Sequence, residues 1–151
     1  MELFETNVGK VSLTKSNYVS SGGQAKVYAK NGMAYKIYED KSAMINLSKI
    51  KELSEIEHTD VIRPINILLD KKDNPVGYSM RFVEDSLVLC QLFTKSFKNR
   101  NGISFETIVD LVKDIKNKVD HIHQKEILIV DLNEMNFLVK NLSYNTAYFI
   151  D

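Results

Sequence analysis

The stretch that most constrains this chain lies near its end, where a carboxylate and an amide precede two short apolar runs. Asp131 and Asn136 are five residues apart, and the apolar run 137–139 follows directly. A second apolar run, 148–150, ends at the acid Asp151. Carboxylate and amide oxygens are the hard ligands that magnesium prefers, and such sites serve phosphoryl transfer. The sequence therefore predicts a magnesium site on two short strands, with one carboxylate to spare.

Composition and charge exclude several other classes of protein. Lys and Arg total 20, and so do Asp and Glu, so no net field draws the chain to nucleic acid or an acidic membrane. The single cysteine, Cys90, cannot form a disulfide within the chain, which fits a reducing compartment. The N-terminus lacks the features of a signal peptide, and no apolar run approaches the ~20 residues of a membrane span. We therefore expect a cytoplasmic protein that binds neither nucleic acid nor membranes.

Residues 1–85 carry the alternation of apolar runs and tight turns that is typical of a small antiparallel sheet. Asn31-Gly32 is a strong two-residue hairpin turn, and Gly22-Gly23 marks an earlier turn. Apolar residues between 41 and 57 recur at helical spacing, so we expect one helix there. The strands that we expect are a pair within 3–13, three within 17–38, and one each at 65–69 and 76–83.

From Ser86 onward the pattern changes to helix. We expect one helix over 87–97 and a longer helix over 104–124, for which Ser104 is a good N-cap. The chain closes with short strands at 136–139 and 146–150. The sequence therefore predicts an α+β chain in two parts, 1–85 and 86–151.

A turn of small residues and a lysine point to phosphate binding in the first part. The segment 20–28 joins two strands, and its small side chains let backbone N–H groups approach phosphate oxygens. Lys36, nine residues after Val27, shares a face of its strand with Ala34 and Tyr38. A lysine on an inner face needs an anionic partner, and an exposed lysine on an edge strand is the alternative.

The order of these features resembles the protein-kinase fold from residue 17 to the end. Met33-Ala34-Tyr35-Lys36 matches the V-A-I-K strand, and 129–136 matches the H-R-D-L-K-P-x-N catalytic loop. The kinase glycine loop aligns with Ser20, Gly22, Ala25 and Val27, where only its central glycine is kept. The resemblance implies a small antiparallel N-lobe sheet with one helix, followed by an incomplete helical C-lobe that ends at the Asp of the D-F-G-type motif.

The resemblance also implies roles for individual residues in an ATP- and magnesium-dependent reaction. Lys36 would hold the α- and β-phosphates, and Asp131 would be the catalytic base toward the substrate hydroxyl. Asn136 and Asp151 would bind magnesium. The residues expected around ATP are Ser21, Gly22, Gly23, Val27, Ala34, Lys36, Met80 as gatekeeper, Arg81 and Val83 through their backbones, and Leu138 as the pocket floor. A strand that runs into a helix cap would look almost the same as this hinge.

The ion-pair partner of Lys36 is left open by the sequence. Glu52 is the expected partner, with Glu55 and Glu57 also available, and a solvated helix face is the alternative for each.

Two departures from the kinase pattern bear on activity. Ile129 and Val130 replace the His and Arg of H-R-D, so the usual clamp on a phosphorylated activation loop is missing. Asn133 stands where Ser/Thr kinases carry a lysine that helps to neutralise the transferring phosphoryl group, so we include it among the expected catalytic residues. Asp-Leu-Asn-x-x-Asn is more like divergent bacterial kinase-like families, and not unlike aminoglycoside and choline kinases.

The expected function is transfer of the γ-phosphate of ATP to a hydroxyl, on protein serine or threonine, with a small-molecule kinase as an alternative. The hypothesis from another class is a nucleotide-binding pseudokinase or truncated interaction module without turnover. A whole kinase domain continues past Asp151, so we expect an incomplete C-lobe whose open surface, on the 104–124 helix, meets a partner or a second copy.

Overall fold

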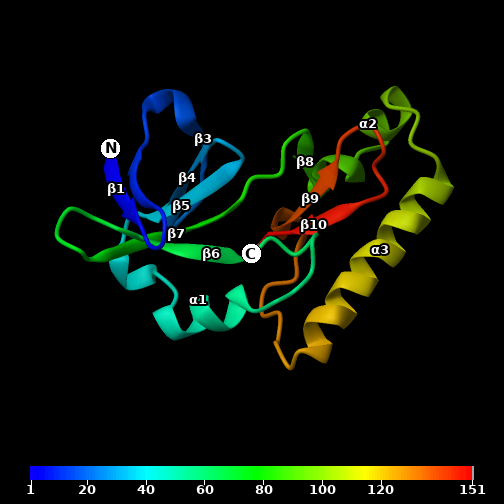
Figure 1. Cartoon of the computed structure of the whole chain (residues 1–151). Coiled ribbons are helices and arrows are strands. Elements are labelled where there is room, and N and C mark those ends of the chain that lie inside the picture. The colour runs from blue at the N-terminus through cyan, green and yellow to red at the C-terminus, as the bar shows by residue number, and fades with distance from the viewer. Residues whose placement is uncertain (151) are drawn as a thin grey trace. The chain divides into compact units, whose positions relative to one another are not determined.

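The computed structural model describes residues 1–150, which form two compact units (Figure 1). Unit 1 comprises Met1–Glu55 and Arg63–Phe82. Unit 2 comprises Ile56–Ile62 and the chain from Val83 onward. No helix in the described part of the chain is long and apolar enough to cross a membrane.

Unit 1 is built on a seven-stranded antiparallel sheet with the order β2-β1-β6-β7-β5-β4-β3. A short helix, α1, lies beside β6 (Figure 1). The strands are β1 Glu2–Glu5, β2 Gly9–Ser12, β3 Tyr18–Ser21, β4 Ala25–Lys30, β5 Met33–Tyr38, β6 Pro64–Leu69 and β7 Pro75–Arg81, and the helical segments are η1 Lys15–Asn17, η2 Lys41–Ala43 and α1 Leu47–Ser54. Each strand that the sequence predicts in this part is present.

The helix expected over 41–57 is shorter than predicted, because two side chains break the segment. Asp40 accepts a hydrogen bond from the Ser42 N–H and caps the short η2 turn. Asn46 accepts from the Ser48 N–H and begins α1. Short Asx side chains offer the backbone a local alternative to a continuous helix, so the apolar spacing alone overestimates its length.

The two faces of the unit 1 sheet have different roles. Tyr35 of β5 lies in a buried core with Leu3, Val11, Leu13, Leu68 and Val76. Successive side chains of a strand point to opposite faces, so Ala34, Lys36 and Tyr38 lie on the other face. The expected grouping of Lys36 with Ala34 and Tyr38 is therefore confirmed.

Unit 2 combines a small sheet with one long helix. Its three antiparallel strands have the order β10-β9-β8, and α3 contacts β10 (Figure 1). Ser104 caps α3 by accepting a hydrogen bond from the Thr107 N–H, as predicted. The elements are β8 Ser86–Val88, η3 Leu89–Phe93, α2 Lys95–Arg100, α3 Phe105–Gln124, η4 Glu134–Asn136, β9 Phe137–Lys140 and β10 Ala147–Phe149.

The single helix predicted over 87–97 is wrong. Leu87 and Val88 belong to β8, where Leu87 pairs with the buried Val139 of β9. Thr94 then caps the separate helix α2 by accepting a hydrogen bond from the Phe97 N–H. Pairing with a strand about fifty residues away in sequence overrides the local helical pattern.

A buried ion network joins three segments of unit 2. The Lys118 side chain on α3 is only 3% exposed, and its Nζ lies 2.5 Å from Asp114 Oδ1 and 3.4 Å from Asp60 Oδ2. The second oxygen of Asp114 accepts a 2.7 Å hydrogen bond from the Ala147 N–H of β10. Asp60 also accepts the Phe149 N–H through its backbone carbonyl, at 2.9 Å. Lys118 therefore links α3, the segment 56–62 and β10.

Replacement of Lys118 tests this network. We expect Lys118→Met to lower the free energy of unfolding by about 1–3 kcal/mol, because it leaves two partly buried carboxylates without their cation. Lys116→Met is a matched control on the same helix, where the lysine is 71% exposed and pairs with Asp120, and it should change the free energy by less than about 0.5 kcal/mol. Urea denaturation measures both, and equal effects would contradict a structural role for the buried network.

Candidate functional site

Lys36 lies over two neighbouring aromatic rings on its face of the unit 1 sheet. Its Nζ lies 5.7 Å from the centroid of the Tyr78 ring and 5.8 Å from that of Tyr38. Both tyrosines are buried, and Tyr78 is directly opposite Lys36 in the pairing of β5 with β7. Aromatic faces attract an ammonium group, so the two tyrosines help to stabilise Lys36 on this face. Sequence reasoning grouped Tyr38 with Lys36 but missed Tyr78.

Gly77 is a second residue that sequence reasoning missed. A Cβ atom at Gly77 would lie 2.0 Å from the backbone oxygen of Lys36. Only a residue without a side chain therefore allows β7 to approach β5 at this point. Glycine inside a strand pattern signals a close backbone approach, and this signal was available in the run 76–83.

Substitution of Gly77 tests this requirement. We expect Gly77→Ala to displace β5 at Lys36 and to destabilise the chain by about 1–3 kcal/mol, as overpacking does. Gly23→Ala is the control, because no described atom outside its immediate chain neighbours lies within 4 Å of a Cβ built there and Gly23 has no positive φ. Thermal unfolding should separate the two variants, and a Gly77→Ala protein as stable as Gly23→Ala would refute the steric argument.

The loop of small residues is a tight hairpin tip between β3 and β4. The Gly22 N–H donates to the Ala25 carbonyl at 2.9 Å, and Ser21 pairs with Lys26. Ser21, Gly22 and Gly23 are exposed. Val27 is directly opposite Lys36 in the pairing of β4 with β5. The expected turn between two strands is confirmed, and its contact with phosphate stays a prediction.

The predicted hinge falls where unit 1 gives way to unit 2. Met80 pairs with Ala34, and both are buried on the face of Lys36. Arg81 ends β7 and is exposed. Val83 is buried, and its carbonyl accepts a 2.8 Å hydrogen bond from Ser86 Oγ. None of the hydrogen bonds between described residues uses the Val83 N–H.

Asp131 is the centre of a hydrogen-bonded loop in unit 2. Asn133 Nδ2 donates to Asp131 Oδ1 at 2.6 Å. Asn136 Nδ2 donates to the Asp131 backbone oxygen at 2.9 Å and to Oδ2 at 3.3 Å. The three residues that were predicted from the catalytic-loop pattern thus lie together, with the carboxylate exposed and held by two amides.

The same hydrogen bonds fix the orientation of Asn136. Both partners of its Nδ2 are acceptors, so its Oδ1 must point away from Asp131. The Asn136 carbonyl accepts a 3.0 Å hydrogen bond from the Ile150 N–H, next to Asp151 in the chain. Asp151 itself lies outside the described residues. A carboxylate and an amide oxygen suit magnesium, which binds one or two carboxylates and keeps several waters.

Other groupings in the described residues do not compete for the metal. Within residues 1–150 no three or more His, Cys, Asp or Glu side chains lie close enough to hold an ion.

Leu138, the predicted pocket floor, is half-buried on β9 and pairs with Val88 and Tyr148. It points to the face of the small sheet opposite the buried Phe137 and Val139.

The structure gives Glu52 a partner on its own helix. Its carboxylate lies 3.0 Å from Lys49 Nζ, and both side chains are exposed. Its pairing with Lys36 stays a prediction and requires a different arrangement of these side chains.

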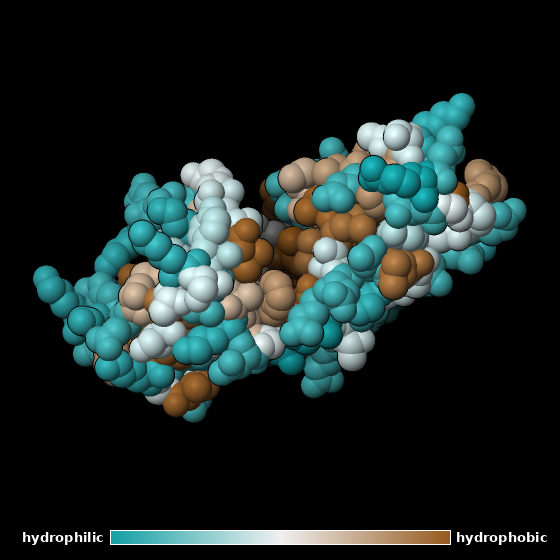
Figure 2. Space-filling model, turned by 90° about the horizontal axis from the view of Figure 1, so that it is seen from above, coloured by the Kyte–Doolittle hydropathy of each residue, from teal (hydrophilic) through white to brown (hydrophobic). Residues whose placement is uncertain are grey.

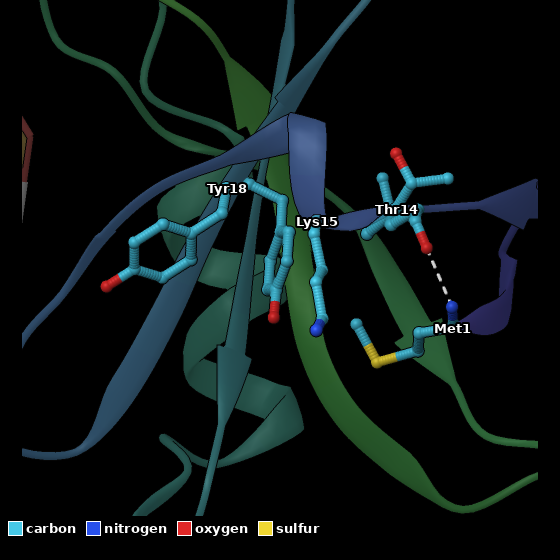
Figure 3. A pocket seen from close by; sticks show the side chains of 6 residues that line it. Met1, Thr14, Lys15 and Tyr18 are labelled. Carbon is cyan, nitrogen blue, oxygen red and sulfur yellow. Dashed lines mark hydrogen bonds between the residues drawn. The ribbon is translucent and has the colours of Figure 1, made fainter.

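Unit 1 also contains a cavity beside the N-terminal Met1 (Figure 3). It has a volume of about 430 Å³, and Tyr18 and Tyr28 meet edge to face in its wall with their ring centroids 5.8 Å apart. Tyr28 follows Val27 on β4 and so points to the opposite face of the sheet. The cavity is therefore distinct from the face that carries Lys36. Its lining residues are Met1, Leu13, Thr14, Lys15, Tyr18 and Tyr28.

Exposed apolar side chains occur along the segment 128–135, which includes Asp131. Hydrophobic residues also reach the surface elsewhere on the face drawn in Figure 2. Val130 is 90% exposed, and Leu128, Leu132 and Met135 are also exposed. A single exposed apolar residue needs no explanation, but this segment exposes four within eight residues.

Comparison with known proteins establishes the fold class. No protein-family model and no curated protein matches the chain. A solved structure of a pseudokinase in its apo form matches with a TM-score of 0.68 at 12% identity, over 90% of this chain and 56% of that one. Rad53 in complex with AMP-PNP matches with a TM-score of 0.67 at 19% identity, over 89% of this chain and 36% of that one. The chain therefore has a protein-kinase-like fold, as the sequence predicts, and spans only part of these two chains.

Proposed function

We propose that this chain is the nucleotide-binding and catalytic part of an ATP- and magnesium-dependent phosphotransferase. It would transfer the γ-phosphate to a hydroxyl of a protein serine or threonine in the cytoplasm. The observation that carries this proposal is the Asp131 loop, where two amides hold an exposed carboxylate. A general base must be positioned toward the proton that it accepts, and the hydrogen bonds that hold the Asp131 carboxylate support this role for it.

The other proposed roles divide between the two units. In unit 1, Lys36 would bind the phosphates, because its ammonium is a cation on the strand face lined by Tyr38 and Tyr78. In unit 2, Asn136 would bind magnesium through Oδ1 together with Asp151. Bound magnesium would neutralise charge on the phosphate oxygens. Glu52 remains the proposed acidic partner of Lys36.

The proposed adenine contacts follow from the buried face of unit 1 and from the hinge. Met80 and Ala34 form an apolar surface beside Lys36. The Val83 N–H has no hydrogen-bond partner among the described residues and is a donor for the adenine edge. That Rad53 was solved with AMP-PNP supports nucleotide binding by this fold. The full set is Ser21, Gly22, Gly23, Val27, Ala34, Lys36, Met80, Arg81, Val83 and Leu138.

Phosphoryl transfer from ATP labelled at the γ-phosphate, measured on the natural full-length protein, tests the catalytic role. We expect Asp131→Asn to reduce kcat by roughly 10²–10⁴-fold, the usual contribution of a general base. Asp110→Asn removes an exposed carboxylate of α3 and should leave kcat unchanged. Unchanged transfer in Asp131→Asn would show that this carboxylate is not the base.

Thermal unfolding with and without Mg-ATP tests the binding residues. Saturation at 100 times Kd stabilises a protein by about 2.7 kcal/mol, so the melting temperature of the wild type should rise. We expect Lys36→Ala and Asp151→Ala to lose this rise, and Lys51→Ala, which removes an exposed lysine of α1, to keep it. A rise that persists in Lys36→Ala would count against its proposed contact with phosphate.

A second function is supported by the exposed apolar segment. Leu128, Val130, Leu132 and Met135 offer a surface for a protein partner or for a second copy of the chain. In this alternative the chain is a nucleotide-binding pseudokinase or interaction module, and the match to a solved pseudokinase agrees with it. Nucleotide binding without transfer by the natural protein would favour this function. Transfer to a small-molecule hydroxyl instead of protein would identify the third alternative, a small-molecule kinase.

A further inference from the structure

We infer that Asn133 is a positioning residue that orients the Asp131 carboxylate. This inference rests on the proposed function and deepens it. In the proposed reaction Asp131 accepts the proton of the substrate hydroxyl as its oxygen bonds to the γ-phosphorus. The bond from that phosphorus to the β–γ bridging oxygen breaks, and ADP leaves. The orientation of the carboxylate therefore matters at the moment of transfer.

Both ends of the Asn133 side chain are already engaged within the loop. Its Oδ1 accepts a 2.8 Å hydrogen bond from the Met135 N–H and caps the η4 turn. Its Nδ2 donates to Asp131 Oδ1 at 2.6 Å. A flipped amide would place N–H against N–H and oxygen against carboxylate, so only one orientation satisfies both partners. Asn133 is locked in place and points at the carboxylate.

The carboxylate is held from two sides. Asn133 Nδ2 binds one oxygen, and Asn136 Nδ2 lies 3.3 Å from the other. The Asn133 N–H and Asn136 Nδ2 also bind the Asp131 backbone oxygen, at 3.2 and 2.9 Å. An ionised carboxylate has about four acceptor sites, so the two amides orient Asp131 and still leave a site for a hydroxyl.

The charge of the loop agrees with a positioning role. Residues 126–139 include Glu126, Asp131 and Glu134 but neither Lys nor Arg. An ammonium at position 133 would form an ion pair with Asp131, whereas an amide directs the carboxylate without neutralising it. Residues 126–139, which lie between Lys125 and Lys140, carry no positive side chain, and in the proposed reaction Lys36 and magnesium would neutralise the phosphoryl group.

Three substitutions separate the orienting bond from the cap. Asn133→Asp and Asn133→Ser keep an oxygen that can cap the η4 turn, but they lose the amide N–H that reaches Asp131. Asn133→Ala loses both. We expect both Asn133→Asp and Asn133→Ser to lose kcat by about tenfold or more, with KM for ATP unchanged. Asn133→Ser should keep the melting temperature of the wild type, whereas Asn133→Asp should lower it because a second carboxylate faces Asp131. Asn133→Ala should lose both stability and kcat.

The outcomes distinguish this inference from the proposed function. If Asp131→Asn abolishes transfer while Asn133→Asp and Asn133→Ser transfer at the wild-type rate, Asn133 does not position the base, and the proposed function stands. If KM for ATP rises and kcat does not change, Asn133 acts on the nucleotide and the inference is wrong. If the wild-type protein transfers no phosphate, the proposed function fails. A measurement that needs no turnover then tests the hydrogen bond from Asn133 to Asp131.

That measurement follows the Asn133 side-chain amide signals in a ¹H–¹⁵N spectrum. We expect these signals to move in Asp131→Ser, which removes the acceptor. They should stay in place in Glu134→Gln, a matched change at a neighbouring acid that has no hydrogen bond to Asn133 Nδ2 among the described residues. Signals that do not respond to Asp131→Ser would overturn the inference, whatever the activity of the protein.

Discussion

The ammonium of Lys118 lies almost completely buried in unit 2, and the positions of three segments depend on its need for negative partners. A buried charge costs several kcal/mol unless it is paired, so α3 and the segment 56–62 must both bring a carboxylate to it. Asp114 also binds the Ala147 N–H, which fixes the start of β10. At the far end of this strand the Ile150 N–H binds the Asn136 carbonyl. The ion network therefore reaches the Asp131 loop through one short strand.

Much of the fold could be predicted because its signals are local. The Asn31-Gly32 turn and the alternation along β5 predicted the hairpin and the face that carries Lys36, and both are confirmed. The helix predicted over 87–97 failed because β8 forms by pairing with β9, a partner about fifty residues away that no local pattern reveals. The burial of Lys118 was not predicted, because it also depends on residues that are distant in sequence. Its spacing from Asp114 was visible, but its contact with Asp60 depends on the tertiary fold.

The sequence predicted which residues form the Asp131 loop, but it did not predict the hydrogen bonds between them. Asp131 and Asn136 were identified from their spacing and Asn133 from the resemblance to the kinase catalytic loop, and the structure brings the three together. From the sequence, Asn133 could be compared with the catalytic-loop lysine of Ser/Thr kinases only by charge. On that basis it looked like a weak substitute. Its use as a cap and as a donor to Asp131 depends on the geometry of the η4 turn. Asparagine is favoured at N-caps. An asparagine at position 133, just before the short segment that ends at Asn136, could therefore have suggested the cap.

The fold alone does not decide between catalysis and binding, because a pseudokinase and an AMP-PNP complex match this chain about equally well. The Asp131 loop carries more weight. An exposed carboxylate held by two neutral amides adds little to folding stability, since net gains from such hydrogen bonds are about 1 kcal/mol each. A fixed orientation of this carboxylate is useful mainly when a reacting hydroxyl must bind to it in that orientation. An interaction module has no need of an oriented carboxylate, so the order of this loop supports the proposed phosphotransferase.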